Sequence, residues 1–244
     1  MDQASLRSAW MVLLVGGLSP AIHAQQGETE IPELAGLFQG RRCVPAASEV
    51  CPEMSRDSAA GFLTARARAF ADAFDELAAP KYDCGPATLP GLFGDPYAFE
   101  IEQLVDRVVF TYEKDDIIRT VWLQEHEHPQ PSIGAFFVHG YSVGRYEGDR
   151  LVVETAKFAF DPTGIAGDYI SAPSSTQKHL TERYWREGDE LKLTLTVEDP
   201  MFLREPTSYT TRWLPAPEDY KLQLYGCDAE QAGRPRRFLI PRYQ

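Results

Sequence analysis

Charged side chains interrupt several apolar segments of this sequence that have the two-residue period of β-strands. They are Glu113, Arg119, Glu154, Glu182, Arg183 and Arg212, and Tyr112 directly precedes the first of them. In a half-buried sheet such residues either face water in cross-strand ion pairs or line a polar interior. An interior carboxyl group with a raised pKa could act as an acid or a base. Because a register shift of one residue exchanges the two faces, the pattern leaves both alternatives open.

Three histidines lie close together in the sequence. His126 and His128 flank Glu127 in an extended segment, and His139 follows after a loop with two prolines. Three imidazoles could bind Zn²⁺ or Cu²⁺. Exposed loop histidines are the favoured interpretation, so no metal and no other cofactor is expected. The segment Gly140–Gly144 matches G-x-S-x-G, but it opens a predicted β-strand and lacks the strand–turn–helix setting of a nucleophile elbow.

Aromatic residues recur along the same predicted strands. Those expected to line a pocket, together with Tyr112, Glu182 and Arg212, are Trp122, Tyr146 and Trp185. Aromatic side chains favour strands in any case, so an ordinary β-core explains them equally well.

The period of the apolar residues indicates which elements position these groups. From Tyr97 onward it is two, which predicts nine strands. They are 98–104, 107–114, 117–124, 141–146, 151–158, 176–186, 190–198, 208–214 and 221–226. Two similar turns, Glu147-Gly148-Asp149 and Glu187-Gly188-Asp189, have the central glycine that a tight hairpin favours.

The predicted fold is therefore mainly β. Successive antiparallel strands form a meander of about 8–10 strands that closes into a lipocalin-like barrel or forms a sandwich. One N-terminal amphipathic helix is expected over 57–79, with an apolar stripe, a cap at Asp57 or Ser58, and Pro80 at its end. Residues 25–54 are expected to be irregular, with one short turn near 34–38.

Composition excludes several classes of protein. The chain has 244 residues, 43% of them hydrophobic, which is enough for a core. Its 36 acidic and 24 basic residues give a net charge of −12, so a general basic surface for nucleic acid is not expected. No apolar run of about 18 residues follows the N-terminal region, so no membrane span is expected in the mature chain.

The N-terminus has the layout of a secretory signal peptide. Arg7 precedes an apolar stretch from Ala9 to Val15, and Pro20 and Ala24 complete a cleavage region before Gln25. The predicted organisation is a signal peptide over 1–24, an irregular segment plus helix over 25–80, a barrel over 81–228 and a basic tail over 229–244. An exported chain, periplasmic or secreted, makes disulfides possible. Of three pairings, Cys43–Cys51 with Cys84–Cys227 is favoured.

Several segments resemble a family of exported bacterial β-rich proteins with no established activity. The resemblance covers about residues 80–228. The segments that carry it are 82–86 (YDCGP), Arg119 through 128–129 (HP), 140–155 (GYSVGRYEGDRLVVET), 181–184 (TERY) and 198–200 (EDP). Two departures are Gln124-Glu125-His126 in place of the family's D-G-R, and Tyr141 in place of a histidine. Glu113, Arg119, His128 and Glu154 match the family and lack a structural explanation, so they become site candidates together with Tyr141.

Three functions remain open. The first is an exported barrel that binds a small, partly apolar ligand in a polar and aromatic pocket. The second is a cofactor-independent lyase, isomerase or hydratase on the same barrel, with His128 or Glu113 as base, Tyr112 or Tyr141 as proton donor and Arg119 as anion stabiliser. The third is an envelope-associated structural protein. The sequence slightly favours the first.

Overall fold

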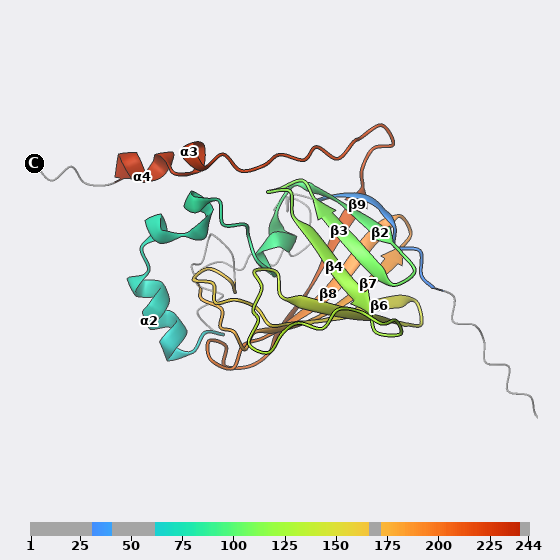
Figure 1. Cartoon of the computed structure of the whole chain (residues 1–244), viewed down its shortest axis with the longest axis horizontal. Helices are drawn as coiled ribbons and strands as arrows, with labels where there is room; N and C mark the ends of the chain where they lie inside the picture. The colour runs from blue at the N-terminus through green and yellow to red at the C-terminus, as the bar shows by residue number, and fades with distance from the viewer. Residues whose placement is uncertain (1–30, 41–61, 166–171, 240–244) are drawn as a thin grey trace, which may run out of the picture.

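The structure, a computed structural model, describes residues 31–40, 62–165 and 172–239, and its strands close into one nine-stranded barrel (Figure 1). The strands are β1 (Gly36–Gly40), β2 (Ala98–Gln103), β3 (Arg107–Tyr112), β4 (Ile118–Leu123), β5 (Tyr141–Glu147), β6 (Arg150–Ala156), β7 (His179–Glu187), β8 (Glu190–Glu198) and β9 (Thr207–Pro215). The expectation of a mainly β barrel is confirmed, and a two-layered sandwich is excluded. The predicted signal peptide, the caps Asp57 and Ser58, and the pair Cys43–Cys51 lie outside the described residues.

The meander is antiparallel except at one place. β4 and β5 pair in parallel through Val121↔Ser142, Trp122↔Val143 and Leu123↔Gly144, which corrects the purely antiparallel prediction. Parallel neighbours need a connection of a dozen or more residues, because the chain must return along the whole strand. The connection over residues 124–140 provides that length.

Barrel closure comes from a strand that the sequence pattern missed. β1 pairs with both β2 and β9, for example through Phe38↔Phe99 and Phe38↔Pro215. The N-terminal segment expected to be irregular therefore provides a barrel strand. The strand predicted over 221–226 is wrong, since this segment forms only an isolated bridge between Lys114 and Tyr225. Eight of the nine predicted strands are present.

The alternation along the strands fills the barrel with side chains. β8 is the clearest case, since Leu191, Leu193, Leu195 and Val197 are all buried. Aromatic rings from β1, β2, β3, β7 and β9 meet inside the barrel. The Phe99 ring contacts four others, those of Phe38, Phe110, Tyr112 and Trp213. Both predicted tight hairpins are confirmed: Gly148 and Gly188 adopt φ of +60°, which favours glycine.

The predicted long helix is much shorter and buries a different face. α2 spans Ala65–Ala73, with the Thr64 hydroxyl accepting a hydrogen bond from the Ala67 amide. The chain then turns into η1 (Glu76–Ala78) and η2 (Pro80–Asp83), because Asp75 caps η1 with its own side chain. The buried residues of α2 are Ala67 and Ala71, whereas the predicted apolar stripe is exposed or only partly buried; it consisted of Phe62, Ala69, Phe70, Ala73, Phe74 and Leu77.

One end of the barrel is covered by segments from distant parts of the sequence. At this end β4, β5 and β7 begin and β3 and β6 finish, and α2, η1, η2 and η3 (Gly91–Gly94) lie beside it (Figure 1). Residues 216–239, here called the C-terminal strap, include α3 (Ala229–Ala232) and α4 (Arg234–Leu239), which contact η1 and η2. Among the described residues no helix has the length and apolar character to cross a bilayer.

Candidate functional site

Two predicted site residues meet inside the barrel. Arg119 of β4 donates two hydrogen bonds to Glu182 of β7, from Nη1 to Oε2 at 2.8 Å and from Nη2 to Oε1 at 2.6 Å. Nη2 also donates to Ser142 Oγ at 3.0 Å and to Thr155 Oγ1 at 2.9 Å, and the Tyr184 hydroxyl donates to Glu182 Oε2 at 2.6 Å. We call these five residues the interior network. All five are buried.

Burial and charge act together on the ionisable groups of this network. Burial raises the pKa of Tyr184, and the Glu182 carboxylate raises it further. Burial alone would lower the pKa of Arg119, but the neighbouring Glu182 raises it above its ordinary value. Arg119 is therefore a permanent cation, and Tyr184 stays protonated as a donor. Because every member is satisfied by another member, the network is a closed structural unit rather than an open binding site.

Tyr112 also points into the barrel, where burial raises its pKa. It packs with Phe110, whose ring lies 5.6 Å from the Arg119 guanidinium. The polar and aromatic side chains expected to line a pocket are thus present inside the barrel. They pack against one another and against the other side chains of the core.

Two further residues, His139 and Lys178, lie near the network, and no pattern in the sequence indicates that they belong together. His139 has a solvent-shielded Nδ1 without a partner among the described residues. Burial lowers the pKa of its imidazole to about 4, and the charges of Arg119 and Lys178 contribute. Lys178 donates to the carbonyls of Leu89 at 2.7 Å and Gly164 at 3.1 Å, and burial lowers the pKa of its ammonium to about 8. No sequence signal distinguishes Lys178, because it lies in a polar stretch that is typical of an exposed strand end.

The other proposed acid–base pair lies on the outer face. His128 Nδ1 is 2.6 Å from the Tyr141 hydroxyl, which itself donates to the Pro129 carbonyl at 2.5 Å. The His128 ring stacks on Trp122, and the Arg107 guanidinium also lies over the Trp122 indole. This cluster does not include Arg119. The predicted catalytic residues are therefore divided among separate places.

The remaining candidates are also spread over the outside or the far end of the barrel. Glu154 accepts a hydrogen bond from Thr181 and lies 3.3 Å from His179 Nε2. Arg212 pairs with Glu190, and Trp185 stacks under Arg150. Tyr146 accepts a hydrogen bond from Gln103 at the opposite end. For Glu154 and Arg212, the outer-face interpretation with cross-strand pairs holds.

Glu113 is buried, and its contacts explain why. Its Oε1 accepts from the Tyr220 hydroxyl at 2.6 Å and from the Gln223 amide at 2.8 Å, and its Oε2 accepts from the Ala98 amide at 3.0 Å. Burial raises the pKa of this carboxyl, but the three hydrogen bonds together lower it below the ordinary value. Glu113 thus attaches the C-terminal strap to the barrel.

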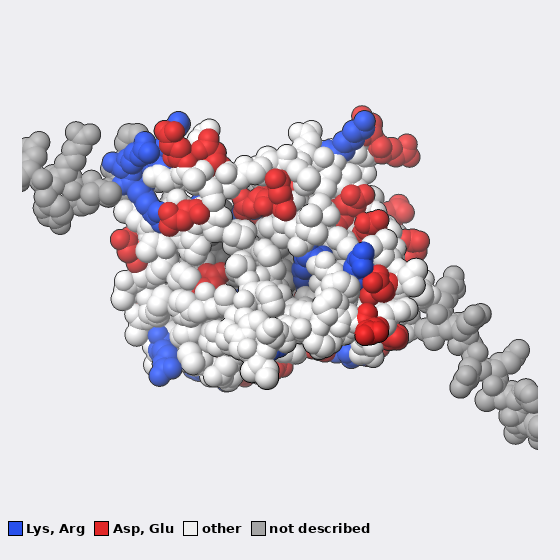
Figure 2. Space-filling view, in the orientation of Figure 1, with Lys and Arg blue, Asp and Glu red and all other residues white. Residues whose placement is uncertain are grey.

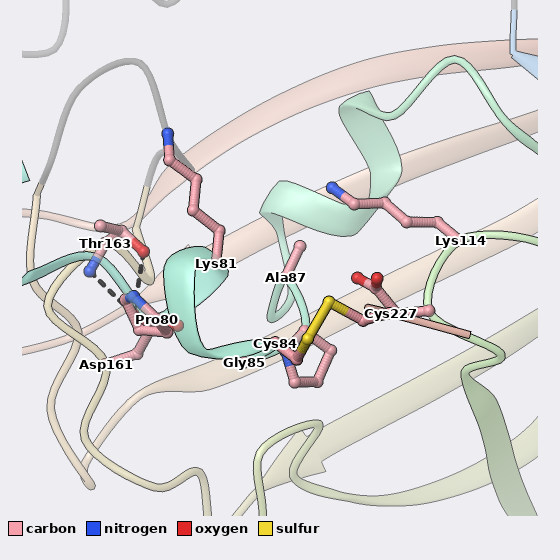
Figure 3. A pocket seen from close by; sticks show the side chains of 11 residues that line it. Pro80, Lys81, Cys84, Gly85, Ala87, Lys114, Asp161, Thr163 and Cys227 are labelled. Carbon is pink, nitrogen blue, oxygen red and sulfur yellow. Dashed lines mark hydrogen bonds between the residues drawn. A yellow bond between two sulfur atoms is a disulfide. The ribbon is translucent and has the colours of Figure 1, made fainter. Parts of the chain in front are cut away.

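A pocket lies beside the Cys84–Cys227 disulfide, at the covered end (Figure 3). This bond joins residues 143 apart and confirms one predicted pair. The pocket, here called the disulfide cavity, has a volume of about 270 Å³. Four segments line it, with Pro80, Lys81, Cys84, Gly85, Pro86, Ala87, Lys114, Asp115, Asp161, Thr163 and Cys227.

Local chemistry fixes the walls of this cavity. Asp161 Oδ1 accepts from the Thr163 amide and hydroxyl, and its Oδ2 accepts from the Thr88 hydroxyl at 2.7 Å. Gly85 lies against Pro80, where a Cβ atom would approach the proline Cβ to 2.5 Å, so a larger residue would displace η2. On the opposite side, Figure 3 shows Lys114 reaching across the view above the disulfide toward Ala87.

The strap closes one side of the cavity. Arg236 forms a two-pronged ion pair with Asp83, next to Cys84, and donates to the Leu77 carbonyl at 2.6 Å. The Asp83 carboxylate raises the pKa of the Arg236 guanidinium, and the Arg236 guanidinium lowers the pKa of Asp83. The disulfide, Arg236 and Glu113 therefore hold the strap at three points.

Comparison with known proteins gives no relative for this site. No family model, curated protein or solved structure matches the chain. The described residues also contain no group of three histidines, cysteines or carboxylates that could hold a metal ion. His126 is exposed, His128 contacts Tyr141 and His139 lies at the covered end, so the alternative of a three-histidine site gains no support.

Proposed function

We propose that this protein is an exported binding protein that holds a small, partly apolar ligand in the disulfide cavity. The observation that carries the proposal is the cavity itself, with apolar walls next to groups of both charge signs. Its volume of about 270 Å³ is slightly below the range of roughly 300–1,000 Å³ typical of sites for drug-sized molecules, so the ligand would be small. Membership of the exported family resembled by the sequence is part of the same proposal.

The lining supports a ligand of particular chemistry. Pro80, Pro86, Ala87 and the disulfide offer an apolar surface, whereas two lysines and two aspartates contribute opposite charges. Because Lys81 pairs with Glu76 at 2.7 Å and Lys114 pairs with Asp95 at 2.9 Å, neither lysine adds an uncompensated positive charge, and a ligand with no large net charge fits best. We therefore expect a short apolar body that carries both hydrogen-bond donors and acceptors, as amino acids and hydroxy acids do.

The proposed compartment follows from the same site. A disulfide that bounds the cavity persists in oxidising environments and is rare in reducing ones. Export through the predicted signal peptide would bring the chain to such an environment. The ligand site and the localisation are therefore linked through Cys84 and Cys227.

Saturation-transfer NMR on the exported protein tests the proposal. The panel consists of aliphatic and aromatic amino acids, the matching hydroxy acids and their uncharged esters. We expect saturation transfer to a subset of these compounds with the wild-type protein and its loss in Ala87→Phe, whose ring would fill the cavity. Ala73→Phe, at an exposed position of α2, is the matched control. Transfer that persists in Ala87→Phe, or no transfer with wild type, would contradict the proposal and favour an envelope-associated structural role.

A further inference from the structure

A second feature of the surface is independent of the cavity. The connection between β4 and β5 exposes Ile133, Phe136, Phe137 and Val138, and Phe160 is exposed nearby in the connection between β6 and β7. Ile133 is fully exposed, and Phe136 and Phe160 are each about half exposed. We call these five residues the apolar rim. Soluble proteins rarely leave such a group of large apolar side chains in water without a role for it.

The apolar rim is held in place by backbone and ring contacts. The Phe137 amide donates to the Lys157 carbonyl at 2.8 Å, and the Ala159 amide donates to the Phe137 carbonyl at 2.8 Å. These bonds tie the two connections together. Phe160 also packs edge-on against Phe70, with ring centroids 5.9 Å apart. The exposed side chains therefore project from a fixed backbone.

The charge around the rim differs from that of the rest of the chain. The sequence has 36 acidic residues, yet residues 128–146 and 155–160 contain none. Their charged residues are Arg145 and Lys157. Figure 2 shows most of the acidic groups in the upper part and on the right side of this face, and a broad area without charged groups over its lower middle, where the yellow-green connection of Figure 1 runs.

We propose that the apolar rim docks this protein on the surface of a zwitterionic phospholipid bilayer. Fully exposed Ile133 projects beyond its neighbours, and a bilayer interface accepts projecting side chains without a matching pocket, which a protein partner would need. Phenylalanine and isoleucine are suited to shallow insertion at the boundary of the headgroups. The local absence of carboxylates avoids the cost of desolvating charged groups at the contact, while the net charge of −12 disfavours anionic lipid.

Co-sedimentation of the full exported chain with dioleoylphosphatidylcholine vesicles tests this surface. Wild type should partition to the vesicles, and Ile133→Ser/Phe136→Ser should lower the partition coefficient by about tenfold or more, because most inserted apolar area is removed. Val105→Ser/Leu224→Ser, which changes two exposed apolar residues elsewhere, should partition like wild type. Equal thermal unfolding midpoints would show that all three proteins are folded.

Three outcomes would overturn the proposal. The first is no partition of the wild-type protein into phosphatidylcholine vesicles. The second is an equal loss in the control variant, or binding that needs phosphatidylglycerol, since both would place the interaction outside the apolar rim. The third is a concentration-dependent dimer, seen by light scattering and abolished by Ile133→Ser/Phe136→Ser, which would make the rim an interface between two copies. None of these results depends on the ligand of the disulfide cavity.

Discussion

The interior network and the disulfide cavity both gather charged groups at the covered end of the barrel, but in different ways. In the network, Arg119 and Glu182 satisfy each other and their hydroxyl neighbours with no space left between them. In the cavity, charged groups from three of the four lining segments surround a volume of about 270 Å³. Charged residues within strands can thus serve the core, while residues of the connecting segments form the space that a ligand can enter.

The largest expected effect concerns the interior network. Glu182→Gln removes the carboxylate and leaves the Arg119 cation buried, so unfolding free energy should fall by about 3–5 kcal/mol in urea denaturation. Arg119→Met/Glu182→Leu removes both charges and should recover much of that loss. A double variant less stable than Glu182→Gln would show that the network contributes more than a mutually compensated pair.

The disulfide should have the next largest effect. Cys84→Ser/Cys227→Ser opens a loop closed over 143 residues, and such a change typically lowers stability by about 2–4 kcal/mol. It should also weaken ligand binding in the cavity while leaving the barrel spectrum in far-UV circular dichroism unchanged. Unaltered stability under oxidising conditions would mean that the strap is held by its non-covalent contacts alone.

Attachment of the strap through Glu113 should have a smaller, pH-dependent effect. Glu113→Gln exchanges an acceptor for a donor facing amide or hydroxyl donors, so we expect a loss of about 1–3 kcal/mol and faster proteolysis of residues 216–239.

The sign of the pH dependence follows from the lowered pKa of this carboxyl. Since its folded pKa lies below the ordinary value of about 4.5, its contribution is complete above that pH. The contribution is lost as the pH falls through the folded pKa. Wild type should therefore approach the proteolysis rate of Glu113→Gln in acid, whereas a constant difference between the two down to pH 2 would exclude this role.

The smallest effect is expected on the outer face. Glu154→Gln is chemically identical to Glu182→Gln and lies on the neighbouring strand, but its carboxylate is partly exposed beside His179 and Thr181. Its loss should change the unfolding free energy by about 1 kcal/mol or less. A loss as large as that of Glu182→Gln would remove the distinction between the interior and the outer face.

Much of the barrel could be predicted because alternation is a local property. Arg119 shares its parity with buried Val121 and Leu123, and Glu182 shares its parity with Leu180, so both lie on the apolar face of their strands. Arg212 shares its parity with Ser208, which is exposed. This comparison of parity was the available signal for separating interior from surface charges.

Other features depend on distant pairing and had no comparable signal. β1 is a short strand with glycine at both ends, and its two partners, β2 and β9, are far away in sequence. The disulfide cavity combines residues near 80–87, 114–115, 161–163 and 227, none of which forms a motif by itself. The parallel pairing of β4 and β5 was indicated only by the length of the intervening connection.

Native mass spectrometry of three exported proteins tests most directly whether the cavity, rather than the barrel interior, is the ligand site. They are wild type, Ala87→Phe and Arg119→Met/Glu182→Leu, each purified without denaturation. The account predicts a small-molecule adduct on wild type and on the double variant, and a bare chain for Ala87→Phe. An adduct that persists in Ala87→Phe but is absent from the double variant would contradict it and place the ligand inside the barrel.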